Sequence, residues 1–130
     1  MLKDGQAAAT LAVADLDRAR KYYTETLGFS VMDDSPMGLL LQAGGGTVLL
    51  VYPSEFAGTN KATAVSFNVD DFDATVEDLR SKGISFMEFD YEGMKTENGV
   101  MQTPVGPAVW FTDPDGNIIN VGHMEVPGQG

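Results

Sequence analysis

The chain has 130 residues, of which 43% are hydrophobic and 21% charged, a balance typical of one globular domain with its own core. Nineteen Asp and Glu against eight Lys and Arg give a formal net charge of −11, which argues against nucleic-acid binding, and the lack of cysteine excludes disulfides, thiolate nucleophiles and cysteine-based zinc sites. We expect a cytosolic protein with no membrane association, because no apolar run approaches the roughly 20 residues that span a bilayer and the N-terminus lacks a signal-peptide core.

The first half of the chain predicts the order β-α-β-β-β. Residues 7–13 form a short apolar segment typical of a strand. Asp15 is then placed to cap a helix, whose apolar residues recur at helical spacing until Gly28 ends it. Turn-forming Ser-Pro and Gly-Gly-Gly segments separate three further predicted strands, at residues 29–32, 39–42 and 47–52.

The second half repeats this order. Residues 63–69 predict a strand, Asp71 can cap a helix with one apolar face, and Gly83 ends that helix. The two capping aspartates and the two terminating glycines are separated by nearly the same number of positions, which indicates an internal duplication. We therefore expect one domain made of two modules, residues 5–56 and 61–126.

The chain between the second helix and the last hairpin is harder to interpret. Residues 85–91 predict a strand. Residues 92–107 are polar, contain three glycines and predict a long loop. Such a loop can be a lid over a binding site or a disordered surface segment, and both interpretations stay open.

The sequence Asp-Pro-Asp-Gly-Asn at residues 113–117 predicts a tight turn. Pro114 supplies the φ of a type I turn, Asp113 can accept hydrogen bonds from the turn amides, and Gly116 can adopt the left-handed conformation that closes the turn. Apolar runs flank the turn on both sides. The pattern therefore predicts two antiparallel strands, at residues 109–112 and 118–123.

Three segments in this order resemble the vicinal oxygen chelate superfamily, which includes glyoxalases, bleomycin-resistance proteins and extradiol dioxygenases. The segments are residues 10–17 with 22–23 and 27–29, residues 67–71, and residues 111–117. The resemblance covers nearly the whole chain. It implies an α+β fold in which two βαβββ modules form a cup-shaped mixed sheet, often completed at a homodimer interface.

In that superfamily the function usually depends on a metal site inside the cup. The resemblance places three of the ligand positions at Ala8, Ala64 and Asn120, and the fourth among residues 48–51, where there is no carboxylate. A methyl group has no lone pair, and a neutral amide binds divalent metals poorly. His123, the single histidine, is expected on the face of its strand opposite to Asn120. We therefore expect neither a metal nor another cofactor.

Strand alternation predicts which side chains line the cup if the former ligand positions face it. Those side chains are small or polar and belong to Ala8, Thr10, Ala12, Ala64, Ser66, Asn68, Ile118 and Asn120. The opposite parity predicts a core of Leu11, Val13, Val65, Phe67, Val69, Ile119 and Val121.

Aromatic and methionine side chains are candidates for the rim of the cup. If Phe111 belongs to the core, Trp110 faces the cup and can stack on a planar ligand, although it can equally be a core residue. Weaker candidates for ligand contact are Tyr52, Phe56, Met87, Phe89, Tyr91, Met94 and Met101.

These observations favour a metal-free binding protein over an enzyme. The predicted ligand is a bulky, planar and polycyclic or cationic natural product or antibiotic, whose sequestration gives drug resistance. The acidic net charge suits a cationic ligand but serves solubility equally well. We expect a homodimer with the cup at or near its interface.

Two alternatives remain. One is a glyoxalase-like lyase or isomerase that acts on a small thiol adduct or dicarbonyl, with acid–base groups among Glu88, Asp90, Glu92, Asn120 and His123. The other is a structural or accessory protein that assembles through its sheet edges.

Overall fold

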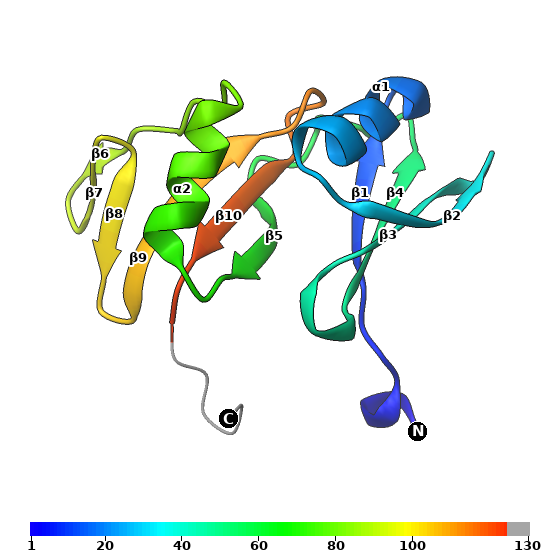
Figure 1. The fold of residues 1–130 in the computed structure, drawn as a ribbon, viewed down its shortest axis with the longest axis horizontal. Helices are drawn as coiled ribbons and strands as arrows, with labels where there is room; N and C mark the ends of the chain where they lie inside the picture. The colour runs from blue at the N-terminus through cyan, green and yellow to red at the C-terminus, as the bar shows by residue number, and fades with distance from the viewer. Residues whose placement is uncertain (125–130) are drawn as a thin grey trace. The chain divides into compact units, whose positions relative to one another are not determined.

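The structure is a computed structural model that describes residues 1–124, and it divides into two compact units (Figure 1). Unit 1 contains Met1–Ala64 and Asp113–Asn117, whereas unit 2 contains Val65–Thr112 and residues 118–124. The closing turn thus packs with the first half of the chain, although the strands that it joins belong to the second half. The last two positions of the expected second module, 125 and 126, lie outside the described residues.

Unit 1 is a four-stranded mixed sheet with one α-helix. The strand order is β1-β4-β3-β2, in which β1 pairs with β4 in parallel and the other pairs are antiparallel. The strands are β1 (Ala9–Val13), β2 (Ser30–Ser35), β3 (Gly38–Gln42) and β4 (Val48–Pro53). The helical segments are η1 (Leu2–Asp4), α1 (Leu16–Lys21), the π-helical η2 (Tyr22–Thr26) and η3 (Gly44–Gly46).

The predicted helix start in unit 1 and the predicted burial of Leu11 and Val13 are confirmed. The Asp15 side chain accepts a hydrogen bond from the Arg18 amide at 3.1 Å, which satisfies one of the amide groups exposed at a helix N-terminus. Helix residues and alternate strand residues then form a common apolar core, made of Leu11, Val13, Ala19, Tyr23, Leu39, Leu41, Leu49 and Val51.

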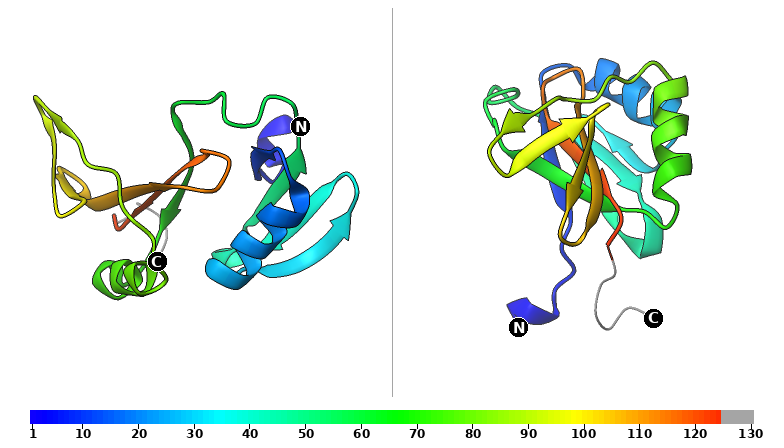
Figure 2. Two further views of the ribbon diagram at one scale, coloured as in Figure 1. Left: turned by 90° about the horizontal axis from the view of Figure 1, so that it is seen from above. Right: turned by 90° about the vertical axis from the view of Figure 1, so that its left-hand side faces the viewer.

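Unit 2 is a six-stranded sheet with α2 (Phe72–Ser81) on one face (Figure 2). The strand order is β5-β10-β9-β8-β7-β6. The strands are β5 (Thr63–Asn68), β6 (Asp90–Tyr91), β7 (Met94–Glu97), β8 (Val100–Thr103), β9 (Gly106–Thr112) and β10 (Ile118–Gly122). Its buried apolar side chains are Phe72, Val76, Leu79, Met101, Ala108, Val109, Phe111, Ile119 and Val121.

The closing hairpin is present as predicted. β9 and β10 are antiparallel, with Asn120 directly opposite Trp110. In the turn, Oδ1 of Asp113 accepts hydrogen bonds from the Asp115 and Asn117 amides, each at 2.9 Å. Gly116 has a φ of 89°, the left-handed conformation that the turn requires. Phe111 is buried, so its neighbour Trp110 emerges on the other face of the sheet.

The prediction of a long loop at residues 92–107 is wrong. This stretch contains β7, β8 and the start of β9. Asn98 and Gly99 both have positive φ, 53° and 78°, and they connect β7 to β8. Asn-Gly is a strong sequence signal for a two-residue hairpin turn, so the local sequence already contained this information. The lid and disordered-loop interpretations therefore do not apply to β7 and β8.

The predicted strand at residues 85–91 is also mostly wrong, because only Asp90 and Tyr91 are in a strand. Residues 84–89 instead contact their neighbours through isolated hydrogen bonds and a small group of bonds at Thr96. The Met87 amide donates to the Trp110 carbonyl at 2.8 Å, and the Thr96 amide donates to the Phe89 carbonyl at 2.9 Å. Apolar side chains alone could not distinguish this irregular segment from a paired strand.

None of the helices in the described part of the chain is both long and apolar enough to span a bilayer.

Candidate functional site

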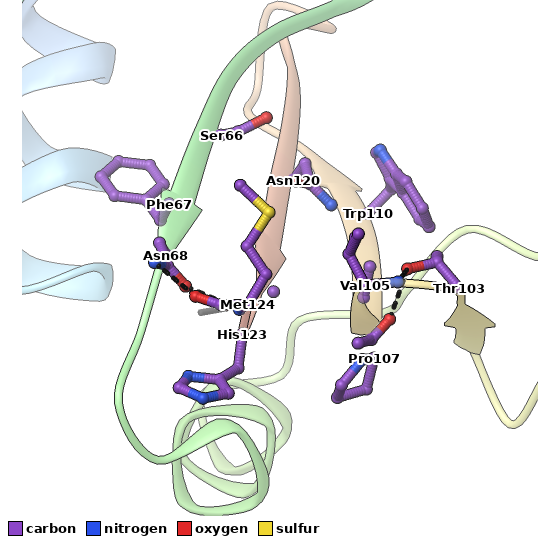
Figure 3. Close-up of a pocket in the computed structure, with 13 residues that line it drawn as sticks. Ser66, Phe67, Asn68, Thr103, Val105, Pro107, Trp110, Asn120, His123 and Met124 are labelled. Carbon is purple, nitrogen blue, oxygen red and sulfur yellow. Dashed lines mark hydrogen bonds between the residues drawn. The ribbon is translucent and has the colours of Figure 1, made fainter. Parts of the chain in front are cut away.

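A pocket lies on the face of the unit 2 sheet that Trp110 occupies (Figure 3). Its volume is about 330 Å³, at the lower end of the range for pockets that bind drug-sized molecules. The residues that line it come from β5, from the β8–β9 connection, from β9 and from β10 and its end: Ser66, Phe67, Asn68, Thr103, Val105, Gly106, Pro107, Ala108, Trp110, Asn120, Gly122, His123 and Met124.

Separate contacts fix the indole and the backbone of Trp110. Its ring meets the Phe89 ring edge to face, with ring centroids 5.6 Å apart and an interplanar angle of 88°. Its backbone carbonyl accepts the hydrogen bond from Met87. Such an edge-to-face pair is a favoured aromatic arrangement, so the indole is a pre-positioned aromatic surface at the pocket wall.

Asn120 stands beside Trp110, because directly opposed residues of an antiparallel pair place their Cβ atoms about 5 Å apart. Its Nδ2 donates a hydrogen bond to the Val109 carbonyl at 3.2 Å. A carbonyl oxygen can only accept, so the orientation of this amide follows from its partner. The Asn120 oxygen, Oδ1, is therefore the acceptor that remains for another group, beside the second N–H of Nδ2.

Small residues form one end of the pocket. Ala108 and Gly122 are paired across β9 and β10. Gly106 has a φ of 140°, and a Cβ at this position would overlap the His123 carbonyl oxygen. Only glycine therefore permits this close approach between the start of β9 and the end of β10. The absence of larger side chains here leaves the space that the pocket occupies.

His123 lies just beyond β10. Its Nδ1 is 2.6 Å from the Val69 carbonyl, so this nitrogen carries the proton that is donated. Figure 3 shows its ring directed away from Trp110 and Asn120, as the strand alternation predicted. Although His123 belongs to the lining, its imidazole does not approach these two side chains.

A second polar cluster holds the closing turn within unit 1. The Tyr23 hydroxyl donates a hydrogen bond to Oδ2 of Asp113 at 2.7 Å, and the side-chain Nδ2 of Asn117 donates one to the Ala12 carbonyl at 2.9 Å. Oδ1 of Asp115 accepts from the Ala14 amide at 2.9 Å and from Arg18 at 2.8 Å. Burial raises the pKa of Tyr23 far above its usual range, and the negative charge of Asp113 raises it further. This cluster is structural.

Residues 5–121 match the model of the Glyoxalase/Bleomycin resistance protein/Dioxygenase superfamily. The chain belongs to this superfamily. A curated relative, the uncharacterized protein YetH of Bacillus subtilis (strain 168), is 28% identical over 114 residues, which cover 82% of this chain and 87% of YetH.

Solved structures from the superfamily share the fold. A bleomycin resistance determinant encoded on transposon Tn5 has a TM-score of 0.71 at 20% identity, covering 94% of this chain and 99% of that one. A lactoylglutathione lyase from Agrobacterium tumefaciens has a TM-score of 0.71 at 18% identity, with coverages of 97% and 98%. TnmS3, an antibiotic binding protein from Streptomyces sp. CB03234, has a TM-score of 0.63 at 24% identity, with coverages of 94% and 98%.

Four of the predicted ligand-binding residues line the pocket, namely Ser66, Asn68, Trp110 and Asn120. The others have different surroundings. Phe89 supports the indole, Met101 is a buried core residue, and Tyr91 and Met94 are exposed on β6 and β7. Met87 lies outside the lining, and its amide donates to the Trp110 carbonyl. The last three, Thr10, Tyr52 and Phe56, belong to unit 1.

The sequence reasoning missed the part of the lining that precedes β9, formed by Thr103, Val105, Gly106 and Pro107. It also missed Ala108, Gly122 and Met124. The prediction that Phe67 belongs to the core is wrong, because this side chain is only half-buried and lines the pocket. The first group was missed because residues 92–107 were assigned to a loop. Recognition of the Asn98-Gly99 turn would have placed the next strand, and hence the start of β9, beside the closing hairpin.

The metal-ligand positions that the superfamily resemblance implies do not suit a divalent metal. Ala8 and Ala64 supply only methyl groups, and the Asn120 amide supplies one neutral oxygen. Elsewhere in residues 1–124, no three His, Asp or Glu side chains are grouped as metal ligands. The donor set of this chain thus differs from one that would hold a catalytic metal.

The candidate acid–base residues of the enzyme hypothesis are not brought together. Glu88 is exposed and accepts a hydrogen bond from the Thr96 hydroxyl at 2.6 Å. Asp90 and Glu92 are also exposed, and all three carboxylates lie outside the pocket lining. Asn120 and His123 do line the pocket, but the His123 ring is directed away from Asn120.

Proposed function

We propose that this protein binds a bulky, planar, aromatic small molecule without a metal and sequesters it, which gives resistance to a toxic natural product or antibiotic. The observation that carries the proposal is the pocket in which the indole of Trp110 is fixed next to small side chains. A planar ring that enters this space can stack on the indole.

The physical basis is preorganisation. The Phe89 ring already restricts the indole in the free protein, so binding costs little further side-chain entropy. Aromatic stacking contributes about 0.5–1.5 kcal/mol beyond the burial of apolar area. Ala108 and Gly122 leave room for a flat molecule to bury much of its surface against the sheet.

The comparisons support binding more directly than catalysis. Two of the similar structures are described as a bleomycin resistance determinant and an antibiotic binding protein. A third is a lactoylglutathione lyase, which keeps a lyase or isomerase as the alternative function. The pocket favours binding, because the carboxylates proposed for acid–base chemistry lie outside its lining.

The single tryptophan provides the test. Titration with a panel of planar polycyclic antibiotics should quench Trp110 emission saturably. In equilibrium dialysis, Trp110→Ala should weaken affinity about ten-fold or more, whereas Trp110→Phe, which keeps an aromatic ring, should lose less. Emission that stays unchanged across the whole panel would contradict the proposal.

We further propose that the protein acts as a homodimer, because the resemblance described above predicts a cup that is often completed at a dimer interface. Light scattering coupled to size-exclusion chromatography should give about twice the mass of 13.9 kDa that the sequence predicts. A monomer at micromolar concentration would overturn this part of the proposal.

A further inference from the structure

We infer that the ligand is an electrically neutral planar aromatic molecule that presents a hydrogen-bond donor, a ring N–H or phenolic hydroxyl, to Oδ1 of Asn120. The inference rests on the proposed function, since it concerns the same pocket. It adds the charge of the ligand and the position of one polar group to the flat shape that Trp110 selects.

The side chains that line the pocket indicate that the ligand is neutral. Among the described residues that line the pocket there is no Asp, Glu, Lys or Arg. The only titratable side chain there is His123, whose Nδ1 is bonded to the Val69 carbonyl and whose ring is directed away from Trp110. A cation in this pocket would lose its hydration without gaining a carboxylate partner, which is costly. The net charge of −11 is therefore carried outside the pocket lining and does not select a cationic ligand.

The donor follows from the orientation of Asn120. Its Nδ2 is held by the Val109 carbonyl, which can only accept a hydrogen bond. Its Oδ1 has no hydrogen-bond partner within residues 1–124 and is the acceptor that this side chain, which lines the pocket, has available. A ligand without a donor would bury this oxygen unpaired, whereas a ligand with one would satisfy it.

The other polar side chains of the lining have fewer available groups. Asn68 uses both ends of its amide on the Met124 backbone, at 3.1 and 3.0 Å. The Thr103 hydroxyl donates to the Gly106 carbonyl at 2.6 Å and accepts from the Val105 amide at 3.2 Å.

Asn120 is thus the acceptor that stands out, and Ser66 adds a hydroxyl that can donate or accept. Because Asn120 lies directly opposite Trp110, the donor of the ligand belongs on the edge of the ring that stacks on the indole.

Three planar tricyclic compounds separate these requirements. Acridone is neutral and has a ring N–H, N-methylacridone is neutral and has no donor, and N-methylacridinium is a cation without a donor. Equilibrium dialysis with the full chain should show that acridone binds about ten-fold more tightly than either of the others. Trp110→Ala should weaken the binding of all three, because each depends on stacking.

Two variants test the role of Asn120. In Asn120→Leu the preference for acridone over N-methylacridone should disappear, because leucine has a similar volume but no hydrogen-bond acceptor. If the preference came only from the bulk of the N-methyl group of the ligand, it would remain in this variant. In Asn120→Asp the size is kept and a negative charge is added, so the preference should shift about ten-fold toward N-methylacridinium. Asn60→Leu is the matched control, because it makes the same change at an exposed asparagine outside the pocket lining and should leave the three affinities unchanged.

The possible failures are distinguishable. If N-methylacridinium binds the natural chain as tightly as acridone, or if the acridone preference survives in Asn120→Leu, the inference is wrong while binding dependent on Trp110 still supports the proposed function. An unchanged order of affinities in Asn120→Asp contradicts the inference as well. If none of the three compounds binds, both the inference and the proposed function are overturned for this ligand class.

Discussion

The phenolic hydroxyl of Tyr23 donates a 2.7 Å hydrogen bond to the carboxylate of Asp113, which lies 90 positions later in the chain. Both residues are buried, with 1% and 4% of their surfaces exposed. Tyr23 belongs to η2, and Asp113 begins the turn between β9 and β10. The bond therefore anchors the β9–β10 turn to the first half of the chain. This turn separates Trp110 from Asn120 in sequence.

Loss of this hydroxyl should destabilise the protein. Tyr23→Phe keeps the ring but leaves a buried carboxylate oxygen with one partner fewer, so the free energy of unfolding should fall by about 1–3 kcal/mol. Urea unfolding measures this change. Tyr91→Phe is the control, because Tyr91 is 68% exposed, and it should shift the free energy by about 0.5 kcal/mol or less. Equal effects of the two substitutions would show that the Tyr23 bond contributes nothing specific.

The same bond predicts a loss of stability in alkali. Burial first, and the Asp113 charge second, raise the pKa of Tyr23 far above its value of about 10 in an unfolded chain. Above about pH 10 the unfolded state releases the phenolic proton while the folded state keeps it, so stability falls as pH rises, by about 1.4 kcal/mol per pH unit for this group. Below that pH both states are protonated and the contribution is constant.

Urea unfolding of the natural chain and of Tyr23→Phe between about pH 9 and pH 11.5 checks this prediction. The natural chain should lose stability more steeply, so the difference between the two proteins should narrow as pH increases. Other titrating groups, such as lysines, act on both proteins alike and cancel in the comparison. Parallel curves over the whole range would mean that Tyr23 ionises alike in the folded and unfolded states.

The small-residue end of the pocket should not tolerate a methyl group at Gly106. A Cβ there would overlap the His123 carbonyl, so Gly106→Ala must move either β9 or the end of β10 and should weaken ligand binding about ten-fold or more. Gly83→Ala is the matched control. Gly83 also has a positive φ, 84°, but a methyl group there would meet no atom within 4 Å, so this variant should show only a backbone cost of about 1–2 kcal/mol and unchanged binding. Normal affinity in Gly106→Ala would show that the pocket does not depend on this close approach.

Ligand binding should not require a metal. Because Ala8, Ala64 and Asn120 stand at the ligand positions that the superfamily resemblance implies, the purified protein should contain well under one divalent metal ion per chain by elemental analysis. Dialysis against a chelator should leave ligand affinity unchanged within about two-fold. One tightly bound nickel, zinc, manganese or iron ion per chain would instead favour the lyase or isomerase alternative.

Local sequence patterns were sufficient for most of the secondary structure. Asp15 and Asp71 cap the two α-helices as predicted, because a capping side chain bonds to amides only a few residues away. Alternation along β1 and β10 correctly placed Leu11, Val13 and Ile119 in the core. Residues 92–107 were misassigned because their polar composition was given more weight than the Asn98-Gly99 turn signal.

The sequence by itself determined the superfamily resemblance, the closing hairpin and the side of its strand on which Trp110 emerges, because these depend on motifs and on a two-residue period. Only the tertiary structure decided that Ser66, Val105 and Trp110 line one pocket, since strand pairing brings together segments that lie far apart along the chain. It also decided that the Asn120 amide nitrogen is bonded to a backbone carbonyl while the oxygen keeps its acceptor capacity. That bond is made to the Val109 carbonyl on the neighbouring strand β9, a partner that no local pattern specifies.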